Sequence, residues 1–150
     1  YYADLLRRSA VELFSGNDVP LVSLYTAEHD GESLAAIITL FSKSEAVYLY
    51  GCSGNIKRNF MPAYLLQWTA IKAARAYGSS FYDMYGMPPA ADESHPMHGL
   101  YLFKTGFGGK NIHRIGTFDV PVSGFYDIYV IAEKLRAFLY KKLKKVFAGR

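Results

Sequence analysis

The stretch GLYLFKTGFGG, residues 99–109, joins a short apolar run to a glycine-rich turn. Its apolar spacing predicts a short helix over 97–104, which Gly106 should end. The glycines of 106–109 permit positive φ and a close approach of the backbone to a ligand. A helix stop that runs into a tight turn is at least as good an interpretation, because no strand–loop–helix of the P-loop type surrounds the glycines.

Towards the N-terminus, the chain predicts an irregular, proline-containing segment over 87–96, a short strand over 81–85 and a clear helix over 59–77. Pro62 suits the first turn of that helix and Gly78 its end. We expect its apolar residues to form one stripe and its polar residues the opposite face. The stripe consists of Met61, Tyr64, Leu65, Trp68 and Ile71, and the polar face of Gln67, Lys72 and Arg75.

The first 50 residues predict a helix over 2–14 and strands over 20–27, 34–41 and 46–50. Asp30-Gly31 suits the hairpin turn between the first two strands. The almost continuously apolar run at 34–41 is typical of a strand buried on both faces. Beyond the opening stretch we expect a strand over 111–120 and a long helix over 124–147. This order predicts one α/β domain over 1–150, with a mixed central sheet and helices on both sides.

Composition limits the class of protein. A chain of 150 residues with 51% hydrophobic and 20% charged residues is long enough to bury a core and is typical of a globular domain. The single cysteine, Cys52, excludes an intramolecular disulfide framework and fits a reducing compartment. We expect no metal site at His95 and His98, because no second ligand pair accompanies them. We expect no cofactor, a cytoplasmic location and, since the chain opens at Tyr1, a piece of a longer protein.

Three patterns resemble the FemABX family of peptidoglycan aminoacyltransferases, the methicillin-resistance proteins. One is the helix opening at 62–68, with Pro62 and Trp68. A second, Tyr82-Asp83-Met84-Tyr85-Gly86, is similar to the family's Tyr-Asp-aromatic-x-Gly strand end, with Met84 in place of the usual aromatic residue. The most specific is the opening stretch, which is similar to the family's Gly-Leu-Tyr-x-Phe-Lys-x-Gly-Phe-Gly-Gly.

The resemblance implies a GNAT-like acyltransferase fold and the C-terminal half of a two-domain protein. It implies an enzyme that moves an amino acid from aminoacyl-tRNA to the side-chain amine of a peptidoglycan precursor, lipid-linked or UDP-linked, on the cytoplasmic side of the membrane. DNA is not an expected partner. The identity of the amino acid and of the acceptor is left open.

Lys104 is the leading candidate catalytic residue. Aminolysis of a tRNA ester builds negative charge on the carbonyl oxygen, which a fixed ammonium stabilises. The resemblance implies a role for Phe103 and Lys104 at the tRNA end, whereas the alternative is a lysine at the C-terminal end of its helix. Asp83, at a predicted strand end, is the candidate general base. The alternative interpretation of this aspartate is a turn-capping role that organises Gly86.

Candidate substrate-binding residues surround these two. Phe103 and Phe107 would offer a stacking face to a terminal adenosine, although such residues are more often core. The expected binding set is completed by residues of the turn, the strand end and the irregular segment: Gly106, Gly108, Tyr85 and His98.

The last predicted helix is strongly basic. The net charge is +4, and no acidic residue follows Glu133. Such a segment favours an anionic partner, here tRNA phosphate or the anionic inner membrane surface, and a solvated helix face is the alternative. The basic residues are Lys134, Arg136, Lys141, Lys142, Lys144, Lys145 and Arg150.

Two rival functions fit the same fold. A CoA-dependent acetyltransferase would cradle pyrophosphate in a glycine-containing turn before the central helix. The junction at 52–59 has one glycine, Gly54, and no second in register, which disfavours CoA. The other rival is a non-catalytic half that docks tRNA while a second domain builds the cleft.

Overall fold

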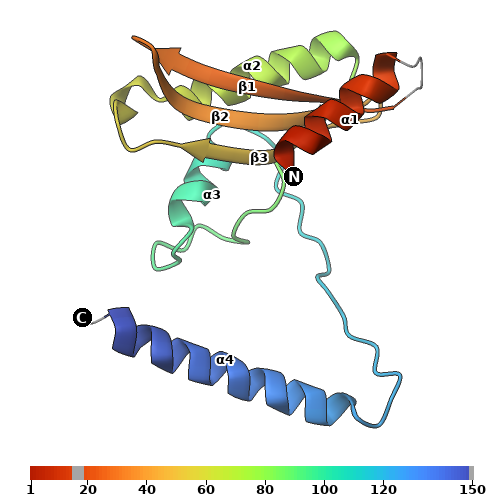
Figure 1. Cartoon of the computed structure of the whole chain (residues 1–150), viewed down its shortest axis with the longest axis vertical. Coiled ribbons are helices and arrows are strands. Elements are labelled where there is room, and N and C mark those ends of the chain that lie inside the picture. The colour runs from red at the N-terminus through yellow and green to blue at the C-terminus, as the bar shows by residue number, and fades with distance from the viewer. Residues whose placement is uncertain (15–18, 149–150) are drawn as a thin grey trace. The chain divides into compact units, whose positions relative to one another are not determined.

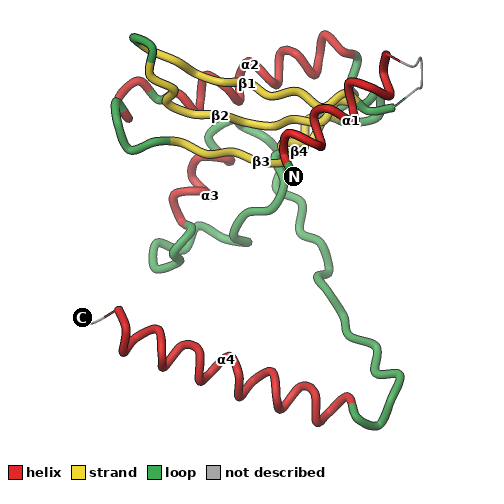
Figure 2. The backbone as a smooth tube through the Cα atoms, viewed as in Figure 1, coloured by secondary structure: helices red, strands yellow, loops and turns green. Residues whose placement is uncertain are grey.

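The computed structural model describes residues 1–14 and 19–148, without the side chains of residue 141 and of 143–148 in the last helix. The chain divides into two compact units, Tyr1–Asn111 and Ile112–Arg150, and each is described by itself. Unit 1 holds the sheet and most of the helices (Figures 1 and 2). Its elements are α1 (Tyr2–Phe14), β1 (Leu21–His29), β2 (Glu32–Phe41), β3 (Ala46–Ser53), the 3-10 turn η1 (Arg58–Phe60), α2 (Pro62–Tyr77), β4 (Tyr82–Asp83) and α3 (His98–Thr105).

The four strands form one mixed sheet in the order β1-β2-β3-β4. The first three make an antiparallel meander, and β4 pairs parallel with β3 after the crossover through α2. Asp30 and Gly31 turn the first hairpin with φ of 53° and 77°. Both positive values are what a two-residue hairpin turn requires. The mixed α/β fold and the hairpin predicted from sequence are therefore confirmed.

Helices lie on both faces of the sheet, as Figure 1 shows for α1 and α2. On one face, Ser9 of α1 donates a hydrogen bond to the Pro20 carbonyl (3.0 Å) and accepts one from the Val22 amide (2.9 Å). On the other face, α2 packs against Ile37 and Phe41 of β2. The strand predicted to be buried on both faces is β2, and most of its residues are buried.

The face of α2 that meets the sheet differs from the predicted one. Its buried residues are Leu66, Gln67, Ala70 and Ala74, whereas Leu65 and Trp68 are 61% and 54% exposed. The expected apolar stripe is therefore wrong, and of the expected polar face Lys72 and Arg75 are exposed whereas Gln67 is buried. Small side chains at two successive turns let the helix approach the sheet closely, and the bulky residues take the outer side.

Three predicted elements have different bounds. The long helix over 59–77 is divided by Met61, whose φ of 50° separates η1 from α2. The strand over 81–85 shrinks to the two residues of β4, and the short helix becomes α3. The start of α2 lies beside α3, and the site described below is built there.

Unit 2 contains α4 (Tyr126–Ala148), which confirms the predicted long helix. The strand predicted over 111–120 is wrong, because residues 111–122 have no regular secondary structure. Ile115 and Phe118 are 89% and 72% exposed. A strand needs a neighbour to share its backbone hydrogen bonds, and within the described residues no strand pairs with this segment.

The basic face of α4 is described only in part, because the side chains of Lys141, Lys144, Lys145 and Arg150 lie outside the described residues. Arg136 forms an ion pair with Glu133 at 2.8 Å, and the ammonium of Lys142 lies 5.8 Å from the Phe138 ring centroid. Among the described residues, no helix is both long and apolar enough to cross a membrane.

Candidate functional site

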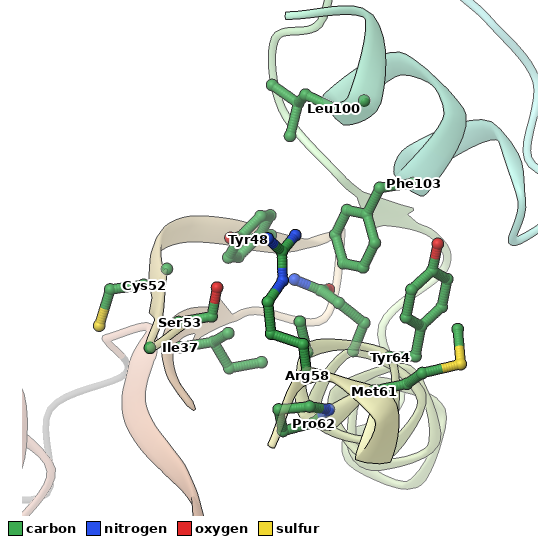
Figure 3. Close-up of a pocket in the computed structure, with 15 residues that line it drawn as sticks. Ile37, Tyr48, Cys52, Ser53, Arg58, Met61, Pro62, Tyr64, Leu100 and Phe103 are labelled. Atoms are coloured by element: carbon green, nitrogen blue, oxygen red, sulfur yellow. The ribbon is translucent and has the colours of Figure 1, made fainter. Parts of the chain in front are cut away.

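A cavity of about 490 Å³ opens in unit 1 where β3 ends and α2 begins. Part of α3 forms its opposite wall (Figure 3). This volume lies within the usual range for small-molecule sites. The lining residues come from β2, β3, the β3–α2 junction, α2 and α3, and are Ile37, Tyr48, Gly51, Cys52, Ser53, Gly54, Arg58, Met61, Pro62, Ala63, Tyr64, Gln67, Gly99, Leu100 and Phe103.

The β3–α2 junction is held in place from both ends. The Gly54 amide donates to the Leu34 carbonyl at 2.8 Å. Lys57, in the left-handed region with φ of 48°, forms a 2.8 Å ion pair with Glu32 beside the hairpin turn. These contacts lead the chain into η1 and place the exposed Arg58 on the cavity lining. Among the described residues, Arg58 is the only lining residue with a full positive charge.

Gln67 lies on the cavity lining and is 0% exposed. The Tyr82 hydroxyl donates a 2.8 Å hydrogen bond to its Oε1. Burial raises the pKa of Tyr82 to about 12, so this hydroxyl keeps its proton at neutral pH. The Gln67 Nε2 group has no hydrogen-bond partner in the described part of the chain. One face of the amide is therefore fixed, and the other has an unused donor.

Tyr48 forms another wall of the cavity. Burial raises its pKa, the nearby Cys52 thiol acts in the same direction, and the Gln67 amide partly offsets both. The amide thus lies near the Tyr48 hydroxyl without meeting it in hydrogen-bonding geometry. The ammonium of Lys104 lies 5.4 Å from the Tyr48 ring centroid, which places a positive charge beside this wall.

Lys104 is 7% exposed and does not belong to the cavity lining itself. Its Nζ donates to the carbonyls of Met84 and Gly86 at 2.5 and 2.8 Å. Burial lowers the pKa of this lysine, and the charge of Asp83 partly offsets the effect. The Lys104 side chain therefore connects α3 to the loop after β4. Phe103, the residue that precedes it in sequence, lies on the cavity wall.

Asp83 organises the turn that follows β4. Its Oδ1 accepts a 2.7 Å hydrogen bond from the Tyr85 amide, which is the turn-capping arrangement considered for it from sequence. Tyr85 adopts φ of 64° and is 67% exposed. Tyr85 is not among the residues that line the cavity.

Phe103 and Phe107 form an aromatic cluster with Tyr64 of α2. The ring centroids of Phe103 and Tyr64 are 4.8 Å apart in an edge-to-face arrangement, and Phe107 stacks on Tyr64 at 5.6 Å. Phe103 and Tyr64 both line the cavity, and Figure 3 shows them on the same side of it. Phe107 supports this wall from behind.

The glycine turn after α3 is a helix stop that runs into a tight turn. Gly106 ends the helix in a right-handed conformation, with φ of −59°, and donates to the Leu102 carbonyl at 3.0 Å. A Cβ at this position would lie 3.1 Å from that same carbonyl oxygen, so the site is tight. Gly108 alone of the turn's three glycines has positive φ, 76°. Neither glycine lines the cavity.

His98 begins α3, next to the lining residue Gly99. Its Nδ1 is buried without a hydrogen-bond partner in the described part of the chain. Within the described residues, no three side chains of the His, Cys, Asp or Glu type gather as a metal site would require.

Sequence reasoning missed most of the cavity's polar lining. Gln67 was expected on the polar face of its helix, and Arg58 was not chosen as a site residue. A glutamine two turns into a helix has no local signal of burial, because amphipathic periodicity assigns polar residues to solvent. The position of Arg58 after the junction glycine was the one usable cue, since residues that precede a helix N-terminus often line ligand sites.

The chain matches the model of the FemAB family over residues 22–134. It is 31% identical over 126 residues to a lipid II:glycine glycyltransferase of Staphylococcus epidermidis, a match that covers 84% of this chain and 30% of that protein. The corresponding protein of Staphylococcus aureus strain USA300 is 32% identical over 120 residues, or 79% of this chain and 28% of the relative. The chain thus spans less than a third of the length of these relatives.

Among solved structures, a crystal structure of FemX is 31% identical, covers 68% of this chain and 22% of that one, and superposes with a TM-score of 0.45. The family model spans the sheet, the cavity, the motif of residues 99–109 and the first part of α4. On that match, the chain belongs to the FemAB family.

Proposed function

We propose that the chain is the C-terminal, GNAT-like half of a two-domain aminoacyltransferase, which moves an amino acid from aminoacyl-tRNA to the side-chain amine of a peptidoglycan precursor. The observation that carries the proposal is the family match over 22–134, together with relatives named as lipid II:glycine glycyltransferases. The cavity supports it, because its aromatic walls and its single arginine suit the end of a nucleic acid strand.

In the proposed reaction the acceptor amine attacks the carbonyl carbon of the aminoacyl ester. A C–N bond forms, the ester C–O bond breaks, and the amine proton passes to the departing ribose oxygen. Negative charge builds on the carbonyl oxygen before the ester bond breaks. This step needs a nearby positive charge and a group that handles the proton.

Lys104 is the proposed source of that charge. An ammonium has three N–H donors, and two of them go to the Met84 and Gly86 carbonyls. We propose that the charge and the remaining N–H serve the developing oxyanion, beside the walls formed by Phe103 and Tyr48. Asp83 is the proposed general base, through Oδ2, since its Oδ1 caps the turn.

The basic helix α4 is the proposed point of contact with the anionic membrane surface or with tRNA phosphate. Lys134 and Lys142 are exposed on it. Co-sedimentation with vesicles that contain anionic lipid, repeated at rising salt, tests the membrane contact, because such binding should weaken as salt increases.

The transfer assay uses the intact parent protein with charged tRNA and a UDP-linked or lipid-linked muramyl pentapeptide, and acetyl-CoA as the control donor. We expect the acceptor to gain the mass of one or more aminoacyl groups from tRNA. Lys104→Ala should lower the rate, whereas Lys110→Ala, at an exposed lysine, should not. Acetyl transfer alone would point to the CoA-dependent rival. Binding of tRNA without any transfer would point to a docking module.

A further inference from the structure

Gln67 is the one polar side chain of the cavity lining that is fully buried. The other polar lining residues, among them Arg58 and Ser53, are exposed or half-buried. A buried amide normally has all of its hydrogen-bonding groups satisfied, because an unpaired donor costs free energy. Nε2 of Gln67 departs from this rule within the described structure. Gln67 itself is a lining residue of a cavity large enough to hold a ligand.

The orientation of the amide is fixed from the other side. Tyr82 donates to Oε1, and the raised pKa of Tyr82 keeps that donor protonated. In this arrangement Tyr82 is the donor and Oε1 the acceptor, so Nε2 is the group of the amide that is left unpaired. An occupant of the cavity gains most if it places a hydrogen-bond acceptor within reach of Nε2.

The other lining residues favour an occupant that is planar and anionic. Aromatic rings from three elements, Tyr48, Tyr64 and Phe103, form the walls. Rings of this kind stack on nucleobases. Arg58 carries the only full positive charge on the lining and pairs well with a phosphate. A lipid-linked muramyl peptide has carboxylates and carbonyls but no flat ring. A UDP-linked one carries a uracil, so its binding is measured beside that of RNA in the test below.

On the basis of the proposed function, we propose that Gln67 is a specificity-determining residue: its Nε2–H donates to a ring nitrogen of the 3′-terminal adenine of the donor RNA, while Arg58 contacts a phosphate. The Gln67 amide then recognises the terminal base through this hydrogen bond. An adenine that lacks the contacted nitrogen loses the hydrogen bond, and the protein keeps the cost of an unpaired buried donor.

The test measures Kd for short single-stranded RNAs that end in CCA, by fluorescence anisotropy at fixed salt with the intact parent protein. Fixed salt matters because phosphate contacts are salt-dependent. Four RNAs differ only in the last base: adenine, 1-deazaadenine, 3-deazaadenine or 7-deazaadenine. Because these analogues alter the ligand and not the protein, the comparison does not depend on the folding of any variant.

A protein variant then assigns the contact. Gln67→Leu alone would leave the Tyr82 hydroxyl unpaired, so the pair compared is Gln67→Leu/Tyr82→Phe against Tyr82→Phe. We expect one deaza analogue to bind Tyr82→Phe and the wild type about fivefold more weakly than adenine, as one neutral hydrogen bond implies. In Gln67→Leu/Tyr82→Phe the same analogue should bind as well as adenine. Such a loss of discrimination is the signature of a direct contact.

Equal discrimination in the two variants would overturn the role of Gln67, and so would four RNAs that bind the wild type alike. In either case wild-type binding of CCA RNA and tRNA-dependent transfer would still support the proposed function. Absence of RNA binding by the wild type would overturn both. If the double variant weakens binding of muramyl pentapeptide and leaves RNA binding unchanged, the cavity holds the acceptor, and the proposal is wrong.

Discussion

Replacing Lys104 with methionine keeps the unbranched side chain but removes the ammonium that joins α3 to the loop after β4. Hydrogen bonds from a charged group contribute about 1.5–3 kcal/mol each, and Lys104 donates two of them. Gly86 is exposed, so its carbonyl regains water in the variant, whereas Met84 is half-buried. Burial of the ammonium costs the wild type free energy, as the lowered pKa of Lys104 indicates, and the methionine variant does not have this cost.

The lost hydrogen bonds outweigh the other two effects, and the variant should have a free energy of unfolding lower by about 2 kcal/mol. This corresponds to a melting temperature lower by roughly 5–10 °C. Thermal and urea unfolding followed by near-UV circular dichroism measure this change. Lys110→Met is the matched control, because that lysine is exposed and lies beyond α3. If the two variants are equally stable, the ammonium does not hold the loop, and the structural role assigned to Lys104 fails.

The lowered pKa of Lys104 means that the unfolded chain binds this proton more tightly. The stability difference between wild type and Lys104→Met should therefore grow as pH rises towards about 10.5, the ordinary lysine value, in urea unfolding at several pH values. Ser9→Ala removes two hydrogen bonds between α1 and the start of β1, and should cost about 1–2 kcal/mol by the same assay. Gly51→Ala should weaken binding of CCA RNA severalfold, because its Cβ would lie 2.0 Å from the Tyr48 hydroxyl. Gly124→Ala, which would meet no atom within 4 Å and is not a lining residue, should bind normally in the anisotropy assay.

Local patterns predicted the elements that depend on local chemistry. The hairpin at Asp30-Gly31 and the buried strand β2 follow from turn residues and from hydrophobic pattern alone. The motif of residues 99–109 likewise led to the correct family and to Lys104, which the structure places next to the cavity. A specific short motif carries this information because its residues are close in sequence and in space.

What the sequence did not predict depends on contacts between distant segments. The faces of α2 were assigned from the spacing of apolar and polar residues, whereas close packing on the sheet selected Ala70 and Ala74. The segment 111–120 has strand-forming residues, but a strand exists only with a partner. Gln67 was assigned to the polar face because its hydrogen-bond donor, Tyr82, lies 15 residues away and on another element.

The two residues of β4 connect the stability of unit 1 with the chemistry proposed for it. Tyr82 is paired with Ala46, and Asp83 with Val47, in a parallel register. Neighbouring residues of a strand point to opposite faces, so a shift of one residue would exchange these two side chains. The Tyr82 hydroxyl would then leave Gln67, and the turn that Asp83 caps would move the carbonyls that Lys104 holds. The orientation of the cavity amide and the position of the lysine therefore depend on one short pairing, which explains why so small a strand matters to the site.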